Sequence, residues 1–202
     1  YYSNSGSRKI GADFSKNLVD NLELHGEYCY SDNLSRTAVF NNLLTSKTVN
    51  DQSYLIGFRW LNSLNTTIIG EYYYNDNGLS KEEYNNYLGY MESVENSANT
   101  SAIRTALNIS QNYFSDNNLM KKYFYIKAIQ PEPFNWLYFT PSVYFIYSIE
   151  DESFMNGVNL LYKPFTNLEF QFTSILTVGS RDSQFGTKEN KNKLEILSRF
   201  YF

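Results

Sequence analysis

The chain has 202 residues, a formal net charge of −4 and a single cysteine, Cys29. This length is enough for one large domain, and one cysteine excludes an intrachain disulfide. The negative charge argues against a nucleic-acid partner. Aromatic residues make up 18% of the chain, yet its mean hydropathy is −0.47. This combination favours elements that separate aromatic and polar side chains onto opposite faces over a soluble domain with an apolar core.

Nine segments alternate apolar and polar residues with a period of two, which is typical of β-strands. They are Lys9–Ser15, Leu22–Ser31, Ser53–Trp60, Thr66–Tyr74, Lys121–Gln130, Trp136–Tyr147, Phe154–Tyr162, Leu168–Val178 and Lys193–Phe202. Short turns are expected at residues 17–21, 61–65, 131–135 and 163–167, and polar loops at 32–52, 150–152 and 179–191. No run of 18 apolar residues is present, so the sequence predicts no transmembrane helix.

The segment between the fourth and fifth strands, residues 75–120, has a different pattern. Ser80 followed by Glu83 predicts a capped helix start, and Tyr84, Tyr87, Leu88 and Met91 follow at helical spacing. A second short helix is expected around Ile103, Ala106 and Leu107. The alternative is a strand over residues 103–109, but an extra strand would reverse the direction of every strand before it. We therefore expect a long, partly helical loop.

The last strand alternates Leu194, Ile196, Ser198, Phe200 and Phe202 with charged residues, and the sequence ends on Phe202. This ending resembles that of bacterial outer-membrane β-barrels, in particular porin-like and alginate-export-type barrels. The resemblance implies an all-β fold, an antiparallel up-and-down transmembrane β-barrel over residues 1–202. It also implies the outer membrane of a Gram-negative bacterium, with lipids as partners. Phe200 and Phe202 would form the signal read by the barrel-assembly machinery.

The expected connections alternate between short and long, and barrels of this kind have short periplasmic turns and long outer loops. We therefore expect the C-terminus to be periplasmic, the loop 75–120 to be extracellular and Tyr1 to lie on the outer side. Single-chain bacterial barrels have an even number of strands. Nine strands that begin outside imply that an odd number of further strands comes from an upstream part or another chain. No signal peptide opens the sequence, so we expect a mature chain or a fragment.

The charged residues in the middle of each strand lie on one of its two faces. We expect this face to line a barrel interior, because an Arg or Lys that faces lipid at mid-membrane costs roughly 2–4 kcal/mol. The expected lumen-lining residues are Asp13, Glu23, Glu27, Arg59, Glu71, Tyr123, Tyr125, Lys127, Tyr138, Tyr144, Glu169, Lys193, Glu195 and Arg199. The acidic and basic members would form opposing walls of a pore, or would simply pair and fill the interior. The tyrosines would form a stacking track for solutes, or fill the interior.

Five aromatic residues are expected at the periplasmic membrane interface, where amphipathic rings prefer to lie. They are Trp60, Phe134, Trp136, Phe165 and Phe202. His25 and Cys29 share a face, but four residues along a strand span about 13 Å, which is too far for two ligands of one metal. With one histidine and no Gly-rich phosphate loop, the sequence predicts no enzyme, no cofactor and no metal site.

Two functions remain open. The first is a porin-like channel that passes or exports polar solutes through a polar, tyrosine-rich lumen, with the loop 75–120 over or in its mouth. The alternative is an outer-membrane scaffold or adhesin that does not transport and that anchors surface or periplasmic partners through its large outer loop.

Overall fold

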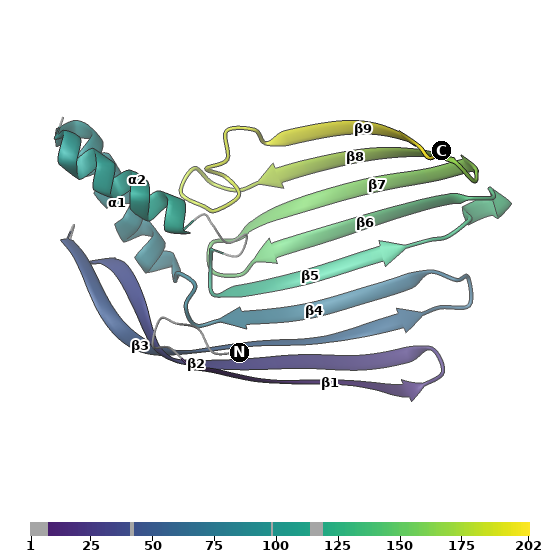
Figure 1. Cartoon of the computed structure of the whole chain (residues 1–202), viewed down its shortest axis with the longest axis horizontal. Helices are drawn as coiled ribbons and strands as arrows, with labels where there is room; N and C mark the ends of the chain where they lie inside the picture. The colour runs from purple at the N-terminus through teal and green to yellow at the C-terminus, as the bar shows by residue number, and fades with distance from the viewer. Residues whose placement is uncertain (1–7, 41–42, 98, 114–118) are drawn as a thin grey trace. The chain divides into compact units, whose positions relative to one another are not determined.

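The structure is a computed structural model that describes residues 8–40, 43–97, 99–113 and 119–202. Within these ranges nine strands form one antiparallel sheet in chain order, which is not closed on itself and has β1 and β9 at its edges (Figure 1). The strands are β1 (Lys9–Val19), β2 (Leu22–Phe40), β3 (Leu43–Leu61), β4 (Thr67–Asn75), β5 (Lys122–Ile129), β6 (Phe139–Ser148), β7 (Ser153–Phe165), β8 (Leu168–Val178) and β9 (Asn192–Phe200). The expected all-β class and the nine antiparallel strands are confirmed.

The chain divides into two compact units. Unit 1 comprises Tyr1–Ala12, Glu27–Tyr54 and Tyr74–Lys122, and unit 2 comprises Asp13–Gly26, Leu55–Tyr73 and Tyr123–Phe202. Unit 2 therefore contains parts of every strand, and unit 1 contains the rest of β1–β4 together with the segment between β4 and β5. Tyr1 and residues 114–118, which were expected on the outer side, lie outside the described residues.

Two kinds of connection alternate along the sheet. Because neighbouring strands are antiparallel, the connections β1–β2, β3–β4, β5–β6 and β7–β8 share one end of the sheet, called here the turn end. The others share the opposite end, the loop end. At the turn end, the Asn21 side-chain amide donates to the carbonyl of Leu61 at 3.0 Å. The Asn62 side chain accepts hydrogen bonds from the backbone N–H groups of Leu64 and Thr66, each at 2.9 Å, which closes the β3–β4 turn.

Several expected boundaries at the turn end are wrong. β1 continues through Val19, so that only Asp20 and Asn21 form the turn, and β7 continues to Phe165. The β7 extension carries Pro164, which lacks a donor, and the register of β7 against β8 shifts between Tyr162 and Phe165. Proline is tolerated in a strand at such an irregularity. β9 ends at Phe200, two residues before the chain does.

The start of the sixth strand is also corrected. β6 begins at Phe139, because Pro133–Asn135 forms a 3-10 turn before it. Tyr138, an expected lumen-lining residue, lies in this connection with φ 63° and 60% of its surface exposed. Alternation along a strand therefore does not place its side chain. This β5–β6 connection, expected to be short, is longer than the β6–β7 connection at residues 149–152, so connection length does not alternate strictly.

In unit 1, the expected polar loop at residues 32–52 is wrong, because β2 and β3 extend through most of it as a hairpin. Polar side chains hold the two arms together. The hydroxyls of Ser35 and Ser46 lie 3.2 Å apart, and the Asn33 N–H donates to the Asn50 side chain at 3.4 Å. A search for alternating apolar residues misses such strands, because the stabilising groups are hydroxyls and amides.

The helical character of residues 75–120 is confirmed, and the alternative strand at 103–109 is wrong. Two helices are present, α1 (Lys81–Ser97) and α2 (Thr100–Tyr113), and they contact each other. The buried face of α1 contains Tyr84, Tyr87, Tyr90 and Val94, so the apolar stripe passes through Tyr90 and Val94 where Leu88 and Met91 were expected. Among the described residues, neither helix combines the length and apolar composition needed to cross a membrane.

Candidate functional site

The sheet in unit 2 has two chemically different faces, and the strand registers define them. Directly paired residues share a face. On one face, Phe124 pairs with Tyr147, Val143 with Val158, and Leu160 with Phe172. Phe172 in turn pairs with Ile196 of β9, so that this face is apolar from β5 to β9. On the opposite face, Lys127 pairs with Tyr144, Thr173 with Glu195, and Glu169 with Arg199. Every expected lumen-lining residue of β5, β8 and β9 therefore lies on this second face, called here the polar face.

The apolar face is the more exposed of the two. Ile196 is 80% exposed and Phe170 is 42% exposed, whereas the neighbouring carboxylate Glu169 on the polar face is 6% exposed. Other large apolar residues that the registers of β5, β8 and β9 place on this face are also exposed: Phe124, Ile126, Leu176, Val178, Leu194 and Phe200. Soluble proteins rarely expose contiguous apolar patches of more than a few hundred Å². This arrangement is the reverse of a sandwich, in which the apolar face is buried.

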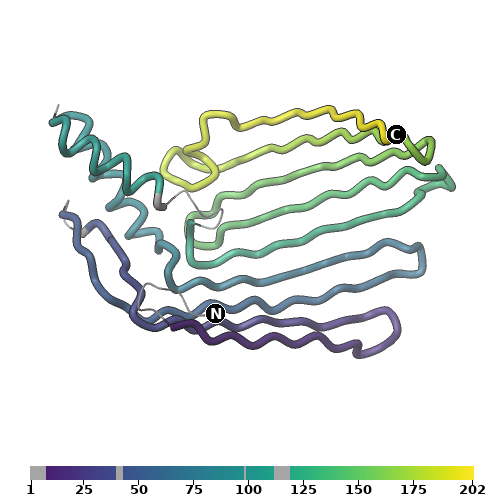
Figure 2. The backbone as a smooth tube through the Cα atoms, in the orientation of Figure 1, coloured from purple at the N-terminus to yellow at the C-terminus, as the bar shows by residue number. Residues whose placement is uncertain are grey.

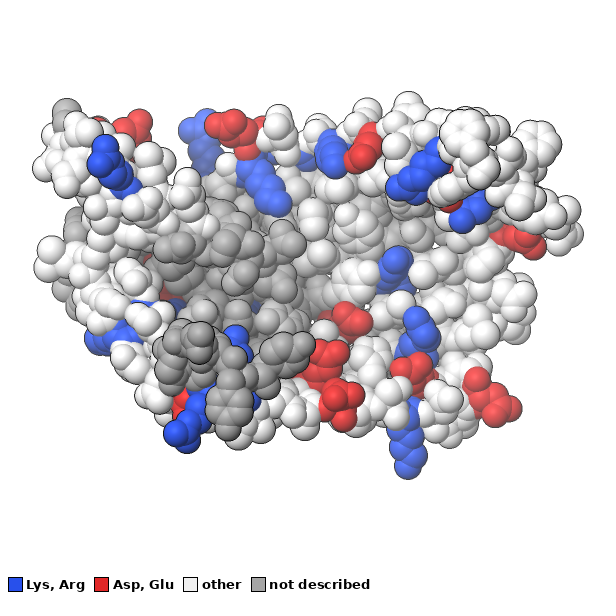
Figure 3. Space-filling view, in the orientation of Figure 1, with Lys and Arg blue, Asp and Glu red and all other residues white. Residues whose placement is uncertain are grey.

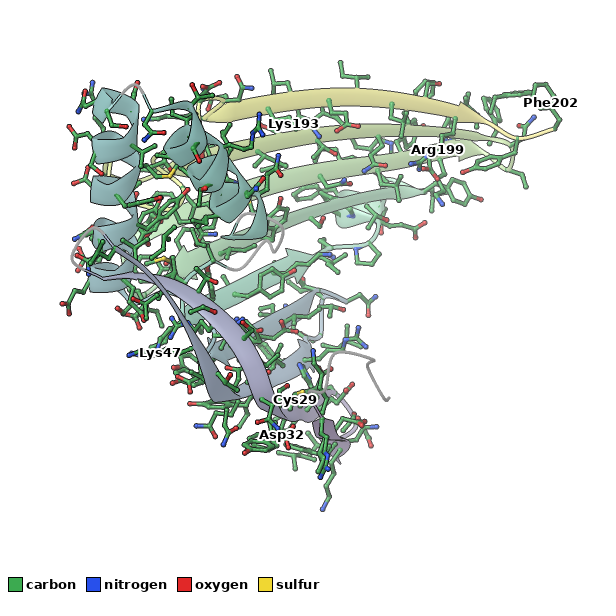
Figure 4. All side chains as sticks on the ribbon, turned by 60° about the vertical axis from the view of Figure 1, so that its left-hand side comes forward. Cys29, Asp32, Lys47, Lys193, Arg199 and Phe202 are labelled. Carbon is green, nitrogen blue, oxygen red and sulfur yellow. The ribbon has the colours of Figure 1, made fainter. Side chains whose placement is uncertain are left out.

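At the turn end of the polar face, Glu169 binds two cations. One carboxylate oxygen accepts a hydrogen bond from the Arg199 guanidinium, and the other lies 3.0 Å from the Lys163 ammonium. Closer to the loop end, Lys193 pairs with Glu195 at 2.7 Å. Lys193 and Arg199 lie along β9, and Phe202 lies beyond its end (Figure 4). Figure 3 shows basic and acidic side chains lying close to one another in the face in view.

The expected acidic group near the N-terminal strands is assembled differently. Glu23 accepts a hydrogen bond from the Ser15 hydroxyl at 2.8 Å, and Glu71 lies 3.4 Å from Nε2 of His25. Arg59, expected beside these carboxylates, has no ion pair among the described residues, and neither has Asp13 or Glu27. Gly57 lets His25 and Glu71 approach each other, because a Cβ there would lie 2.6 Å from Nε2 of His25. Cys29 is a half-buried free thiol.

The tyrosines of the polar face divide into covered and accessible residues. Tyr123 is 3% exposed, and its hydroxyl donates to the Gln184 side chain in the β8–β9 connection. Tyr125 and Tyr144 are half-buried, with ring centroids 6.5 Å apart and planes at 40°. Lys127, directly paired with Tyr144, is half-buried and has no ion pair or hydrogen-bond partner among the described residues.

The structure of the β8–β9 connection was not indicated by the sequence pattern. Residues 179–191 coil back on themselves between the two strands (Figure 2), and Ser183, Gln184 and Phe185 are buried. Asp151 holds this segment: one carboxylate oxygen accepts from the backbone N–H of Gln184, and the other accepts from the Ser153 hydroxyl at 2.8 Å. Its sequence reads only as polar, and no local motif predicts where it docks.

The expected interface aromatics are gathered at the turn end. Trp60 precedes the last residue of β3, Phe165 is the last residue of β7, and Trp136 precedes β6. The Trp136 ring lies 4.4 Å from that of Phe139 and 5.7 Å from that of Tyr162. Phe200 and Phe202 form an edge-to-face pair at 5.1 Å, and Phe202 is fully exposed. Offset and edge-to-face contacts of this kind stabilise aromatic clusters.

Unit 1 has a polar cluster of its own. Ser80 and Glu83 form the predicted capping box, with the Ser80 N–H donating to Glu83 at 2.8 Å and the Glu83 N–H donating to the Ser80 hydroxyl at 3.2 Å. Arg36 of β2 lies 2.9 Å from Glu83 and donates to the carbonyl of Gly78 at 3.0 Å. Desolvation by burial acts to raise the pKa of Glu83, but the Ser80 hydrogen bond and the Arg36 charge outweigh it and lower the pKa below the ordinary value.

This cluster borders a cavity of about 440 Å³ between the β2–β3 hairpin and the start of α1. Its lining includes Arg36, Lys47, Glu82 and Lys121. Lys121 pairs with Asp76 at 3.3 Å and Arg36 with Glu83, so that most of its charges are already neutralised. Among the residues that the structure describes, no group of three or more His, Cys, Asp or Glu side chains is placed to hold a metal ion.

Comparison of the chain with known protein families, with curated proteins and with solved structures yields no match.

Proposed function

We propose that this chain supplies strands to a bacterial outer-membrane β-barrel whose polar face lines a water-filled path for polar solutes. One observation carries the proposal: the sheet of unit 2 exposes Phe170 and Ile196 on one face and holds Glu169 nearly buried on the other. A transmembrane barrel needs an apolar outward face and a polar interior. Hydrocarbon would cover the exposed side chains, and water in the interior would solvate the charges.

The two edges of the sheet support a role for further strands. Unpaired N–H and C=O groups at an edge are not tolerated in hydrocarbon, so a sheet in a membrane must close. β1 and β9 have odd positions in an antiparallel order and run in the same direction. Closure with only antiparallel pairs therefore needs an odd number of additional strands between them. We propose that another segment or another chain supplies these strands.

The turn end supports a periplasmic C-terminus. Two of its connections, at residues 20–21 and 166–167, are only two residues long, while the longest connection, between β4 and β5, lies at the loop end. The aromatic residues Trp60, Trp136 and Phe165 at the turn end fit a membrane–water interface. In this proposal Phe202 is read by the barrel-assembly machinery, the loop 75–120 is extracellular, and the protein has no enzymatic activity.

The polar face favours passage of solutes over a filled interior. Its charged side chains are paired along the sheet itself, as in Glu169 with Arg199 and Lys193 with Glu195. Both partners of each pair belong to the same sheet, so these charges do not need partners from an opposite wall. Lys127 and Arg59 have no pairing partner among the described residues, so an aqueous path would contain charges available to solutes.

The test is conductance of the full chain, with its closing strands, in planar lipid bilayers. Discrete conductance steps that persist after deletion of the α1–α2 segment are expected, because the lumen is formed by the sheet. A variant with Phe202 deleted is the assembly control, and it should insert less efficiently in cells while conducting normally once inserted. An intact seal, both with the α1–α2 segment and without it, would overturn the channel proposal.

A second function is favoured by α2. Ile103 is 38% exposed and Leu107 is 55% exposed, one helical turn apart. Such a pair on a surface helix is suited to contact another protein, which supports a scaffold or adhesin role. A partner that co-purifies with the chain and is lost with Leu107→Glu, in a protein that does not conduct, would favour this function over the channel.

A further inference from the structure

The middle of the polar face contains a tyrosine pair beside a lysine that has no ion pair among the described residues. Tyr144 of β6 pairs directly with Lys127 of β5 on one side and with Gly157 of β7 on the other. The Tyr125 ring lies 6.5 Å from the Tyr144 ring, tilted by 40°. These four residues, Tyr125, Lys127, Tyr144 and Gly157, are called here the tyrosine slot, and all belong to unit 2.

Gly157 determines how Tyr144 lies. A Cβ at position 157 would be 2.2 Å from both Cε1 and Cζ of Tyr144, so the outer part of the ring occupies the space that a side chain would fill. The ring therefore lies over the backbone of β7 and does not stand upright from the sheet. Aromatic rings that cover a strand glycine in this way are a known device of sheets. The half-buried ring keeps a surface on which a flat solute can stack.

The charges around the slot are unequal. Lys193 lies in the same row of the sheet, through the pairs Gly157–Ile175 and Ile175–Lys193, and it interacts electrostatically with Tyr144. Its ammonium is neutralised by Glu195 at 2.7 Å. Glu71 of the neighbouring strand β4 interacts electrostatically with Tyr125, on the opposite side of the slot from Lys193. Lys127, paired with Tyr144, has no compensating carboxylate in the part of the chain that the structure describes. The ammonium of a half-buried lysine gains from a carboxylate partner.

The β8–β9 connection closes one side of the slot. Tyr123 precedes Tyr125 by two residues on the same face, which is a separation of about 6.6 Å between Cα atoms. Gln184 binds the Tyr123 hydroxyl, and Tyr123 is 3% exposed. The slot is therefore bounded by Tyr123 and Gln184 on the loop-end side, while Tyr125, Tyr144 and Lys127 are only half-buried.

We propose that the tyrosine slot binds aromatic monocarboxylates, with the solute ring stacked on Tyr144 and its carboxylate paired with the Lys127 ammonium. The identity of the solute as a transported substrate rests on the proposed channel, but the binding site itself does not. An aliphatic carboxylate would use only Lys127, and a neutral aromatic solute would use only the rings. A solute that has both groups gains both interactions.

The test is binding of benzoate to the full chain in lipid nanodiscs, followed by ligand-detected NMR and calorimetry. We expect saturable binding that is weakened about tenfold by Lys127→Gln, which removes a charge-assisted hydrogen bond. Tyr144→Leu is expected to weaken binding severalfold, and Gly157→Ala likewise, because its Cβ displaces the ring. Lys16→Gln, which removes an exposed ammonium on β1, is the matched control and should bind like the unchanged protein.

Three further ligands separate the contribution of the aromatic ring to binding from that of the carboxylate. Cyclohexanecarboxylate keeps the charge without the flat ring, benzyl alcohol keeps the ring without the charge, and acetate has neither ring nor bulk. All three should bind several times more weakly than benzoate. Equal binding of acetate and benzoate, or benzoate binding that is unchanged in Lys127→Gln, would overturn the inference. Proteolysis and circular dichroism identify any variant that has lost its fold, and the ligand series in the unchanged protein then tests the inference without that variant. Lys127→Arg keeps the charge and should retain binding.

The two proposals fail in distinguishable ways. A conducting chain that shows no saturable benzoate binding refutes the tyrosine slot and leaves the channel intact. A chain that binds benzoate through Lys127 but never conducts refutes the channel and leaves the binding site intact.

Discussion

Among single residues, Glu169 shows how the polar face holds its charges. The side chain is nearly buried, and it accepts from Arg199 while Lys163 lies at 3.0 Å. Because Lys163 belongs to the irregular end of β7, where the register shifts, the strand distortion supplies one of the two partners. Loss of the carboxylate removes the anion that both cations contact.

Glu169→Gln is expected to lower the free energy of unfolding more than Glu195→Gln does, since it removes a nearly buried carboxylate that two cations contact. Urea unfolding in micelles measures this value. Glu195→Gln is the matched control: its pair with Lys193 is exposed on both sides, and exposed pairs contribute little to stability. Equal effects of the two substitutions would contradict the role given to burial.

Glycines opposite aromatic rings are a second residue-scale feature. A Cβ at Gly70 would lie 2.5 Å from Cε1 of Phe58, and one at Gly26 would lie 2.5 Å from Cε1 of Phe14. Gly70→Ala should destabilise the protein by about 1–3 kcal/mol, because overpacking forces the ring out of its position. In the background of Phe58→Leu the same substitution should cost much less. A double-mutant cycle of unfolding free energies measures the coupling, and strict additivity would disprove it.

At the level of elements, apolar alternation was sufficient to predict nine strands and their faces, but not their ends. In β8, Phe170 and Phe172 alternate with Glu169 and Gln171. This alternation determines which side chains share a face, because a shift by one residue would exchange the two faces. The arms of the β2–β3 hairpin pair through Ser35 and Ser46, and no apolar period marks them. Element boundaries there depend on cross-strand hydrogen bonds between residues far apart in sequence.

The start of α1 was predictable because the capping box is a local motif. Its partner Arg36 was not, since Arg36 and Glu83 are 47 positions apart and meet only through the hairpin. The ordinary pKa of this carboxyl is 4.5. Because the folded-state pKa of Glu83 lies below it, Glu83 contributes stability that is fully present above about pH 4.5 and is lost as the pH falls through the folded-state pKa.

We therefore expect amide protection in the first turns of α1 to decrease as the pH falls from about 6 to about 3, after correction for intrinsic exchange. Glu83→Gln should remove this pH dependence, and Arg36→Gln should raise the pKa of Glu83 toward 4.5, as measured by NMR titration of its carboxyl carbon. Glu92→Gln, which changes an exposed carboxylate of the same helix, is the control. A Glu83 titration that ignores Arg36 would contradict the assignment.

At Gly89, in the middle of α1, substitution by alanine should stabilise the protein, in contrast to the substitution at Gly70. A Cβ at this position would meet no atom within 4 Å, so alanine adds no clash. Gly89→Ala should stabilise the helix by about 0.5–1 kcal/mol through its lower conformational entropy in the unfolded chain. Increased amide protection within α1 is the measurement. A loss of protection would show that the position is needed as glycine for a reason other than local packing.

At the scale of the whole molecule, the sequence was informative about faces and much less so about sites. Parity alone placed Lys127, Glu195 and Arg199 on one face with Tyr144, as the registers show. Parity said nothing of which charges pair, because pairing depends on register and on strand ends. The docking of residues 183–185 beneath Asp151 and Tyr123 depends on a connection that carries no periodic signal. The tyrosine slot and its wall therefore emerge only from the assembled sheet.

The proposed membrane placement makes one prediction that depends on the direction of two adjacent side chains in β8. Ser174 lies between Val158 and Leu194 on the apolar face, and Thr173 lies between Asn159 and Glu195 on the polar face. Both side chains are small, so arginine adds a similar bulk and the same charge at each position, and the difference between the two variants reports the surroundings of the charge.

If hydrocarbon covers the apolar face, Ser174→Arg should cost roughly 2–4 kcal/mol of folding free energy in lipid vesicles, while Thr173→Arg, next to water and Glu195, should cost less than about 1 kcal/mol. Reversible urea unfolding in vesicles gives both values. In detergent-free buffer the order has no reason to hold, because an exposed arginine is well solvated. A cost at Thr173 equal to or greater than that at Ser174 in vesicles would mean that lipid does not contact the face that contains Phe170 and Ile196, and the barrel orientation would have to be abandoned.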